Sequence, residues 1–419
     1  MSPTTSPSAA HSGHGPLWRI LFLPFAAGYF VSYFFRTANA VIGLPLAEEL
    51  HLSAGDLGLL TSTYFLTFAF AQIPLGMLLD RYGSRRVEAG LLLLAAIGAL
   101  VFASGDGIAR LAAGRALIGL GVSACLMASY KAFASWYPPE QQASMSGWIM
   151  AAGGLGAVAA TAPLEMALHL TGWRQLFIGL AVATVLVALW IFRQVPDAPG
   201  GHAPEPMRVQ WQGVCEVFAS RHFWRYAPIG LVQIGGLQAI HGLWAASWLK
   251  NVNGFDRATA ADHLATMSIA MLIAYVGIGM LATRLLRRGV SPTLLLGGGI
   301  GVSMTVLLLI ALDVLPHQSV FTHLLWGAYG TFITFGTLAY SQCAQGFPLR
   351  LAGRANTAFN LMVFIGAFAL QWGVGALFDL FARAGVDRLA AHQMVFVGIA
   401  LSQFAALGWF LWGGRRAKA

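Results

Sequence analysis

The sequence has few charged residues and few cysteines, and both shortages exclude whole classes of protein. Charged residues make up 10% of the 419 positions and hydrophobic residues 57%, whereas a soluble globular protein has about 25% charged residues. The three cysteines, Cys125, Cys215 and Cys343, show no disulfide framework and no zinc-site spacing. The chain also lacks a Walker motif, a glycine-rich dinucleotide loop and HExxH. We therefore expect no metal site, no cofactor and no enzymatic activity.

Long apolar runs are what the sequence has instead. Each run is about 20 residues or longer, which is enough to cross a bilayer as a helix. This predicts an all-α polytopic membrane protein. The twelve runs lie near residues 17–46, 55–80, 87–104, 108–134, 142–168, 173–194, 222–249, 259–286, 292–313, 317–346, 352–380 and 389–412.

The placement of positive charge predicts how these helices are oriented. With the N-terminus inside, 16 of the 25 Lys and Arg fall in cytoplasmic segments and 6 fall outside, while Arg36, Arg115 and Lys131 lie within spans. This asymmetry follows the positive-inside rule, so we expect both termini to be cytoplasmic, in a bacterial-type inner membrane. The net charge of +9 then reflects topology and contact with the bilayer, and we expect no nucleic-acid partner.

Proline and glycine mark a division of the chain into two halves. We expect a disordered cytoplasmic tail, an N-terminal bundle of six helices, a proline-rich cytoplasmic linker with an amphipathic segment, a C-terminal bundle of six helices and a second tail. These parts are residues 1–16, 17–194, 195–220, 221–412 and 413–419.

The two halves also echo each other in sequence. The loop GMLLDRYGSRRV at residues 76–87 has a counterpart, GMLATRLLRRGV, at residues 279–290. Two pseudo-symmetric bundles of six helices are an architecture of transporters, with the substrate site between the halves near the middle of the bilayer.

A single arginine, Arg36, lies inside the first apolar run with no acid near it. A guanidinium at that depth costs about 2.5–3.5 kcal/mol on insertion scales, so it normally faces a watery cavity. Tyr29, Tyr33 and Ala40 share its helix face within about 60°. This pattern predicts an anion-binding cavity, and the alternative is an arginine that snorkels to the membrane surface.

Polar residues follow one face of two further spans. Gln238 and His241 share a face of the seventh span, and Asn360 and Gln371 belong to a stripe in the eleventh. These side chains either line the cavity or form hydrogen bonds between helices. His241 is also a candidate carrier of a coupling proton, because histidine titrates near neutral pH.

Three charged residues near the ends of spans have simpler interpretations. Lys131 either adds positive charge to the cavity or snorkels to the cytoplasm. Glu165 and Asp379 lie near the outer ends of their spans, and we expect both to meet water.

The loop after the second span resembles the cytoplasmic loop motif of the Major Facilitator Superfamily, and this resemblance extends over essentially the whole chain. Glycines permit a tight turn there, and the aspartate can accept hydrogen bonds from arginines and a helix N-terminus in one state only. We therefore expect a gate, and the alternative is a charge cluster that only sets topology. The motif residues are Gly76, Asp80, Arg81, Gly83, Arg85 and Arg86.

Arg115-Ala-Leu-Ile-Gly119-Leu-Gly121 is similar to a second motif of that superfamily. The resemblance implies a role for Arg115 in proton coupling, and the alternative is a structural arginine that binds helix ends. The fifth span lacks the Gly-Pro pairing of the superfamily's antiporter motif, which disfavours drug/proton antiport.

The first span and the segment after it resemble organophosphate/phosphate antiporters and organic anion:cation symporters. The resemblance lies in Tyr33-Phe-Phe-Arg36-Thr-Ala-Asn39, Leu44-Pro45 and Ser53-Ala-Gly-Asp56-Leu-Gly58. It implies that Arg36 contacts an anionic substrate. The symporters often carry acids before this arginine and in the fourth span, where this chain has Phe35 and Gly121-Val-Ser-Ala-Cys125. Proton symport and anion exchange therefore both stay open.

These patterns together predict secondary active transport of a small organic anion, a carboxylate or phosphate ester, by alternating access. Arg36, with Tyr29 and Tyr33, is expected to bind it. An inorganic anion or a zwitterionic solute such as an amino acid is the alternative cargo. A receptor or scaffold that does not transport is the alternative from another class. We expect the protein to work as a monomer, with protons as a further ligand if transport is coupled to them.

Overall fold

All regular structure in the described residues of the computed structural model is helical. The structure describes residues 17–197, 207–314, 316 and 319–416. The expected tail at 1–16 and the middle of the expected linker, 198–206, lie outside these residues. The helices of the first half are η1 (Trp18–Phe22), α1 (Leu23–Thr37), α2 (Asn39–Leu50), α3 (Ala54–Ala103), α4 (Ile108–Gly121), α5 (Cys125–Trp136), α6 (Pro139–Ala159), α7 (Ala162–Thr171) and α8 (Trp173–Gln194).

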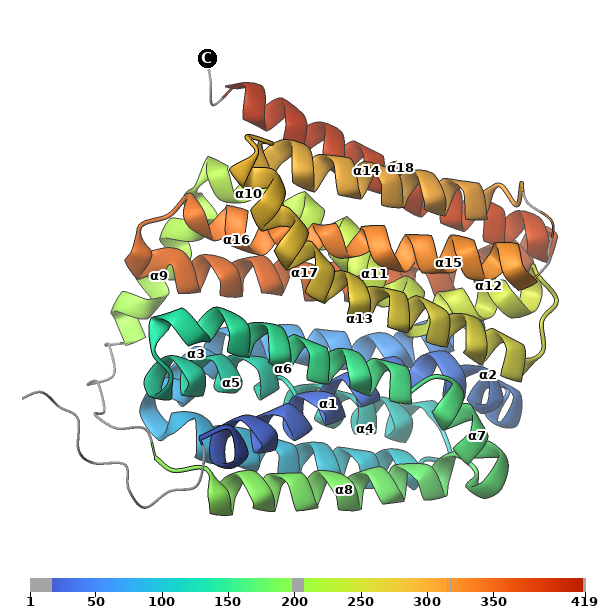
Figure 1. The fold of residues 1–419 in the computed structure, drawn as a ribbon. Coiled ribbons are helices and arrows are strands. Elements are labelled where there is room, and N and C mark those ends of the chain that lie inside the picture. Colours follow the sequence, from blue (N-terminus) through green and yellow to red (C-terminus); the bar gives the residue numbers. More distant parts are fainter. Residues whose placement is uncertain (1–16, 198–206, 315, 317–318, 417–419) are drawn as a thin grey trace, which may run out of the picture.

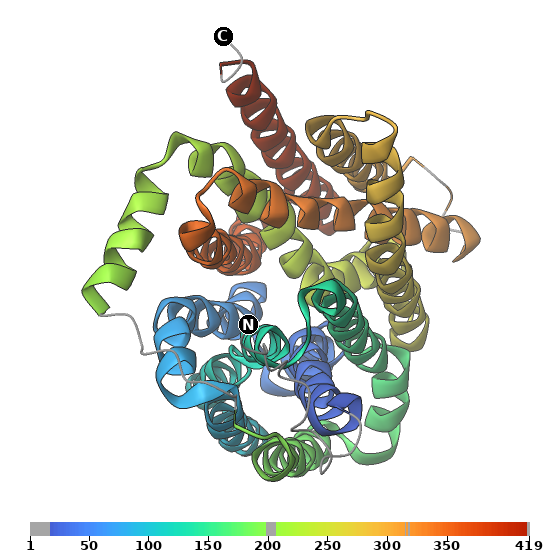
Figure 2. The same cartoon turned by 60° about the vertical axis from the view of Figure 1, so that its left-hand side comes forward.

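The second half repeats this pattern of long apolar helices, and Figure 1 shows it stacked on the first half. Figure 2 shows the segment of α9 and α10 running along the outside of the helical body. The helices are α9 (Met207–Ala219), α10 (Arg221–Pro228), η2 (Ile229–Ile234), α11 (Gly235–Ala239), η3 (Ile240–Trp244), α12 (Ala245–Asn251), α13 (Arg257–Arg287), α14 (Pro292–Ala311), α15 (Ser319–Ile333), η4 (Thr334–Thr337), α16 (Leu338–Gln345), α17 (Leu349–Arg383) and α18 (Arg388–Arg416).

The predicted spans do not correspond one to one with these helices. Nine helical stretches of the described chain are long and apolar enough to cross a membrane, or ten if α6 and α7, which meet at 44°, form one broken span. The single long helix α3 contains the second and third predicted spans. The run from α15 to α16 corresponds to the tenth.

Gly83 explains why α3 holds two spans. Its φ of 77° and ψ of 161° are not helical, and the helix bends there. A residue with a Cβ pays a steric cost at positive φ, whereas glycine does not. The motif glycine is therefore the turn that reverses the chain between two spans.

The helices run between two ends of the molecule, which we name by their residues. The motif end carries residues 76–86 and the start of α9, on the left of Figure 1. The opposite end carries α2, α7 and α12, on the right. The helices α3 and α17 pack against each other across the two halves. Hydrogen bonds from Asn360 and Gln371 of α17 to Gln72 and Thr61 of α3 cross this contact, and we call these four residues the polar seam.

Candidate functional site

Arg36 lies in a small cavity between the two bundles. The lining comes from α1 and α6 of the first bundle and from α11, η3 and α13 of the second. The cavity is therefore placed where a solute that passes between the bundles would have to go. Its polar and aromatic lining residues are Tyr33, Arg36, Thr37, Gln238, His241, Ser268 and Tyr275.

The guanidinium of Arg36 is buried among aromatic rings without a counter-charge. The side chain is 8% exposed, and its Nε has no hydrogen-bond partner among the described residues. Its Cζ lies 4.5 Å from the ring centre of Tyr33 and 5.3 Å from those of Phe68 and Phe364. Aromatic faces stabilise a cation by about 0.5–2 kcal/mol. These rings supply no negative charge, and the Nε–H has no acceptor among the described residues, so the guanidinium can still bind an anion.

The two predicted tyrosines have different positions. Tyr33 lines the cavity, whereas Tyr29 is 3% exposed and is not among the lining residues. The Tyr29 ring packs edge to face on Tyr33 with centroids 5.0 Å apart, and its hydroxyl lies 3.8 Å from Met150 Sδ. Tyr29 therefore supports the ring of Tyr33 rather than lining the space beside Arg36.

The second bundle contributes His241 and Gln238 to the same cavity. His241 is 6% exposed, and its Nε2 lies 2.8 Å from the hydroxyl of Ser268 on α13. It belongs to the π-helical segment η3, and π-turns inside α-helices occur frequently at functional sites. The histidine thus faces the arginine's cavity with one ring nitrogen held by a serine.

Sequence reasoning missed the contribution of α13. Ser268, Met271, Leu272 and Tyr275 all line the cavity. Their spacing of three, four and seven residues places them on one helix face. Two polar residues at that spacing inside an apolar run were the signal that could have identified this face.

Asn360 and Gln371 lie outside this cavity, in the seam between α3 and α17. The Asn360 Nδ2 donates to Gln72 Oε1 at 2.9 Å, and the Gln371 Nε2 donates to Thr61 Oγ1 at 2.9 Å. Gln371 is fully buried. Both amides therefore hydrogen-bond between the bundles, which is the second of the two alternatives that the sequence left open.

Arg115 binds the backbone next to Arg36. It is 1% exposed, and its Nη1 donates to the carbonyl oxygen of Phe35 at 3.2 Å. Its Cζ also lies 5.4 Å from the ring centre of Tyr64. This contact ties α4 to α1 one residue before the cavity arginine.

The motif residues form contacts within the first half of the chain. Asp80 accepts from Lys131 Nζ of α5 at 2.5 Å, so Lys131 neither enters the cavity nor stays unpaired. Arg85 donates to Asp197 at 2.6 Å, and Arg86 lies 3.6 Å from the same carboxylate. Arg81 stacks over Tyr82 instead. The ion pairs of Asp80, Asp197 and Glu216 at the motif end each join residues of one half of the chain.

The opposite end, in contrast, has ion pairs between the bundles. Lys250 Nζ of α12 lies 2.5 Å from Glu48 Oε1 of α2. Arg257 of α13 lies 3.4 Å from Glu165 of α7. The expectation that Glu165 meets water is wrong, because this residue is 3% exposed. The neighbouring bundle covers it, which the sequence of one helix does not reveal.

Asp379 adds a third link at this end. Its carboxylate accepts from Ser53 Oγ at 2.9 Å and from the backbone N–H groups of Ala54 and Gly55 at 3.1 Å and 2.9 Å. These are the first residues of α3, whose N-terminal N–H groups have no helical acceptor. An acid of α17 therefore caps a helix of the other bundle, where the macrodipole favours negative charge.

Charge pairing also affects Glu48 itself. The hydrogen bond from Lys250, together with the positive charge of Lys250, holds the pKa of Glu48 below its usual range. The carboxylate is thus favoured while the two bundles touch at this end.

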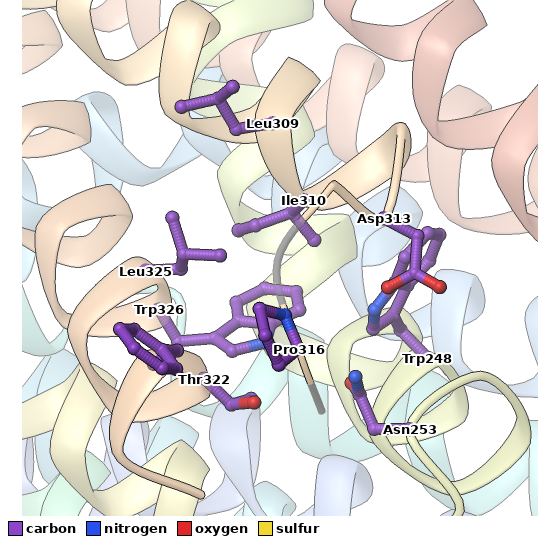
Figure 3. A pocket seen from close by; sticks show the side chains of 10 residues that line it. Trp248, Asn253, Leu309, Ile310, Asp313, Pro316, Thr322, Leu325 and Trp326 are labelled. Carbon is purple, nitrogen blue, oxygen red and sulfur yellow. The ribbon is translucent and has the colours of Figure 1, made fainter. Parts of the chain in front are cut away.

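A separate hollow lies at the opposite end of the second bundle and is shown in Figure 3. It is lined by Trp248, Asn253, Asp313, Trp326 and neighbouring apolar residues. Trp248 lies here and packs on Phe396 with centroids 4.7 Å apart. None of the predicted binding residues is part of this hollow, so it is distinct from the cavity of Arg36.

The sequence is similar to known membrane transporters. The model of the Major Facilitator Superfamily matches residues 25–371. The probable sulfoacetate transporter SauU of Cupriavidus necator is 24% identical over 278 residues, which cover 62% of this chain and 64% of the relative. The probable L-galactonate transporter of Escherichia coli is 32% identical over 178 residues, covering 41% of this chain and 37% of the relative. The matched stretches thus span less than two thirds of these relatives.

A solved structure is similar over nearly the whole chain. It is a bacterial homologue of the human lysosomal transporter Spinster in an inward-facing, unoccupied conformation. The TM-score is 0.76 at 16% identity, with 96% of this chain and 98% of the other covered. The predicted fold of membrane-spanning helices in two bundles is confirmed.

Proposed function

Because this chain belongs to the Major Facilitator Superfamily, we propose that it is a secondary transporter that carries a small organic anion across a membrane by alternating access. The resemblance to this superfamily seen in the sequence is confirmed by the same match. The substrates named for the two relatives, sulfoacetate and L-galactonate, are both small carboxylates. They are the first candidates for this protein.

The single observation that carries the proposal is the buried, unpaired guanidinium of Arg36 between the bundles. A carboxylate or sulfonate can accept two parallel N–H bonds from the planar guanidinium fork. Tyr33 and Gln238 line the same cavity, and their side chains offer a hydroxyl and an amide for the rest of an oxygen-rich substrate. Tyr29 acts through Tyr33, and Arg115 acts by fixing the backbone before Arg36.

We propose that the motif end faces the cytoplasm of a bacterial-type inner membrane, with both chain termini on that side. The excess of Lys and Arg in the segments at this end supports this orientation. The ion pairs between the bundles at the opposite end then close the outer side.

We also propose that the motif loop acts as a gate and that the chain is divided into two bundles, a linker and two tails as the sequence predicts. In the cycle, Asp80 leaves Lys131 and engages the other bundle when the outer side opens, with Gly76, Arg81, Gly83, Arg85 and Arg86 shaping the loop that carries it. The division into bundles at 17–194 and 221–412, joined by the linker, fits a rocking motion about the cavity. The proposed transport unit is a monomer.

Calorimetry with sulfoacetate and L-galactonate on purified protein tests the binding role of Arg36. Arg36→Ala should weaken binding by about 10- to 150-fold, because a hydrogen bond to a charged group contributes about 1.5–3 kcal/mol. Arg36→Lys should have an affinity between those of the wild type and Arg36→Ala, because lysine keeps the charge but loses the planar fork of donors.

Arg193→Ala is a matched control, because Arg193 is exposed near the end of α8 and is not a lining residue of the cavity. It should leave affinity unchanged. Wild-type affinity in folded, monodisperse Arg36→Ala protein would contradict the organic-anion proposal. Binding without uptake into proteoliposomes would instead support the receptor alternative.

A further inference from the structure

Glu88 of α3 is a buried acid that the proposed binding site does not use. It is 0% exposed, and among the described residues no charged group pairs with its carboxyl, whose polar neighbour is the thiol of Cys125. Removing an ionised carboxylate from water without a partner costs several kcal/mol. The carboxyl is therefore neutral in this state, and ionisation requires the helices around it to move or admit water.

Three helices surround the carboxyl with small or apolar groups. On α1, a Cβ added to Gly28 would lie 2.4 Å from Glu88 Oε1 and 3.5 Å from Ile191 Cδ1 of α8. On α5, the thiol of Cys125 is the titratable group that interacts with the carboxyl. A larger residue at position 28 would therefore have to displace the Glu88 carboxyl.

The charged residues of these helices are engaged elsewhere. Arg36 of α1 lies among aromatic rings, and Lys131 of α5 pairs with Asp80. Arg193 is near the exposed end of α8, and Arg85 of α3 pairs with Asp197. Within the described part of the chain, Glu88 forms no ion pair.

Glu88 lies at the start of the second span of α3, five residues after the turn at Gly83, and it packs beside two other membrane-spanning helices. Gly28 and Cys125 lie near the middle of the apolar stretches Trp18–Thr37 and Ile108–Trp136. An ionisable side chain at such depth is expensive, and in membrane proteins such residues mark proton relays and substrate paths.

We propose that Glu88 carries the coupling proton of this transporter, which makes the transport cycle proton symport rather than anion exchange. This inference rests on the proposed function. In the state described here the carboxyl is protonated and α1 packs against it. When α1 moves, water reaches the carboxyl, its O–H bond breaks, the proton passes to that water and a carboxylate remains. Reprotonation from water on the other side of the membrane restores the neutral form.

The helix α1 connects this proton site to the substrate site. Gly28 and Arg36 belong to one uninterrupted helix, eight residues and so about 12 Å apart. The thiol of Cys125 lies within electrostatic range of both Glu88 and Arg36. A displacement of α1 on anion binding therefore changes the packing at Glu88, which couples the two ligands.

Two transport assays on Glu88→Gln separate coupling from binding. Proteoliposomes take up labelled sulfoacetate or L-galactonate, either driven by an imposed pH gradient or by exchange against internal substrate without a gradient. Gln keeps the neutral shape of the protonated acid. The variant should retain exchange and substrate affinity, and its gradient-driven uptake should fall to simple equilibration. Glu216→Gln, which changes an exposed acid of α9, should retain both activities.

Gradient-driven accumulation at the wild-type level in Glu88→Gln would overturn the proposal. Loss of accumulation in His241→Gln together with its retention in Glu88→Gln would assign the proton to the histidine. Failure of the proposed function gives a different result, because it appears as unchanged calorimetric affinity in Arg36→Ala.

Chemical labelling of the wild-type protein keeps the proposal testable if Glu88→Gln does not fold. Dicyclohexylcarbodiimide is apolar and reacts with protonated carboxyls in apolar surroundings. Mass spectrometry should find the adduct on Glu88, with loss of gradient-driven uptake and with less adduct at alkaline pH. An unmodified Glu88, or a modified Glu88 with full accumulation, would contradict the assignment.

Discussion

Arg36 combines burial with the absence of any acidic partner, and the sequence already contains both parts of this description. An arginine in an apolar run predicts depth, and the lack of a nearby acid predicts that the charge is free. The same reasoning did not reveal that Tyr29 supports Tyr33 or that Asn360 and Gln371 bond between bundles. Those outcomes depend on which helix lies opposite, and one helix's periodicity does not specify its neighbour.

If the opposite end is the outer side, as proposed, Glu48 is the residue at which external pH acts on its closure. Its pKa is lowered while Lys250 is bound and returns toward the ordinary glutamate value when the bundles separate. Protons therefore bind more tightly to the open state. The contribution of this pair to closure is fully present above the ordinary value and is lost as pH falls through the lowered one.

Acidification should thus open the outer side, by about 1.4- to 5-fold in the ratio of states, because exposed ion pairs contribute about 0.2–1 kcal/mol. Distances between spin labels on α2 and α12 measure this ratio, in protein whose exposed Cys215 is replaced by Ser. Glu48→Gln should remove this part of the pH dependence. Asp256→Asn is the control, because hydrogen bonds from Thr259 within the same bundle lower the pKa of Asp256. If Glu48→Gln kept the pH dependence of the wild type, the pair of Glu48 and Lys250 would not be its cause.

At the scale of elements, α3 and α17 carry an acid at each end of their contact. Asp379 of α17 caps the start of α3 at the opposite end, while Asp80 of α3 stays with Lys131 at the motif end. Under the proposed gating, Asp379 is the latch that is engaged in this state and Asp80 is the latch that is not.

The two latches predict opposite effects of matched substitutions. Asp379→Asn should favour the outward-open state by about two- to five-fold, since a charge at a helix N-terminus contributes about 0.3–1 kcal/mol. Asp80→Asn should slow turnover without changing affinity for the anion in the inward-facing state, because Asp80 does not line the cavity. The spin-label distances and proteoliposome uptake measure these effects. A larger closed fraction in Asp379→Asn, or unchanged uptake in Asp80→Asn, would contradict the assignment of these two acids as latches.

At the scale of the whole molecule, composition and charge placement were sufficient to predict a polytopic helical protein with a repeated half. Helix breaks were harder to predict. Gly83 was recognisable as a turn, but the bend between α6 and α7 and the π-turns around His241 were not. Such features arise when packing against a second helix outweighs the regular α-helical pattern. Glu88 was missed for a related reason, since only the surrounding helices show that it is buried.

Orientation in the membrane is also a property of the whole chain, and reporter fusions test it. A fluorescent protein that folds only in the cytoplasm, fused after Ala419, should fluoresce because the adjoining segments are rich in Arg and Lys. The same reporter in the short loop around Gly254, at the opposite end, should stay dark. The reverse pattern would invert the proposed topology and make the closed side cytoplasmic.

The π-helical segment η3 has a mechanical consequence for the whole cycle. A π-turn holds more residues than an α-turn, so rewinding η3 as α-helix would advance everything beyond it by roughly one residue, or about 100° of rotation. His241 lies within η3, and the chain continues without interruption through α12 to Lys250. A change of winding at the cavity would therefore rotate Lys250, so the conformation of η3 and the ion pair between Lys250 and Glu48 are mechanically linked.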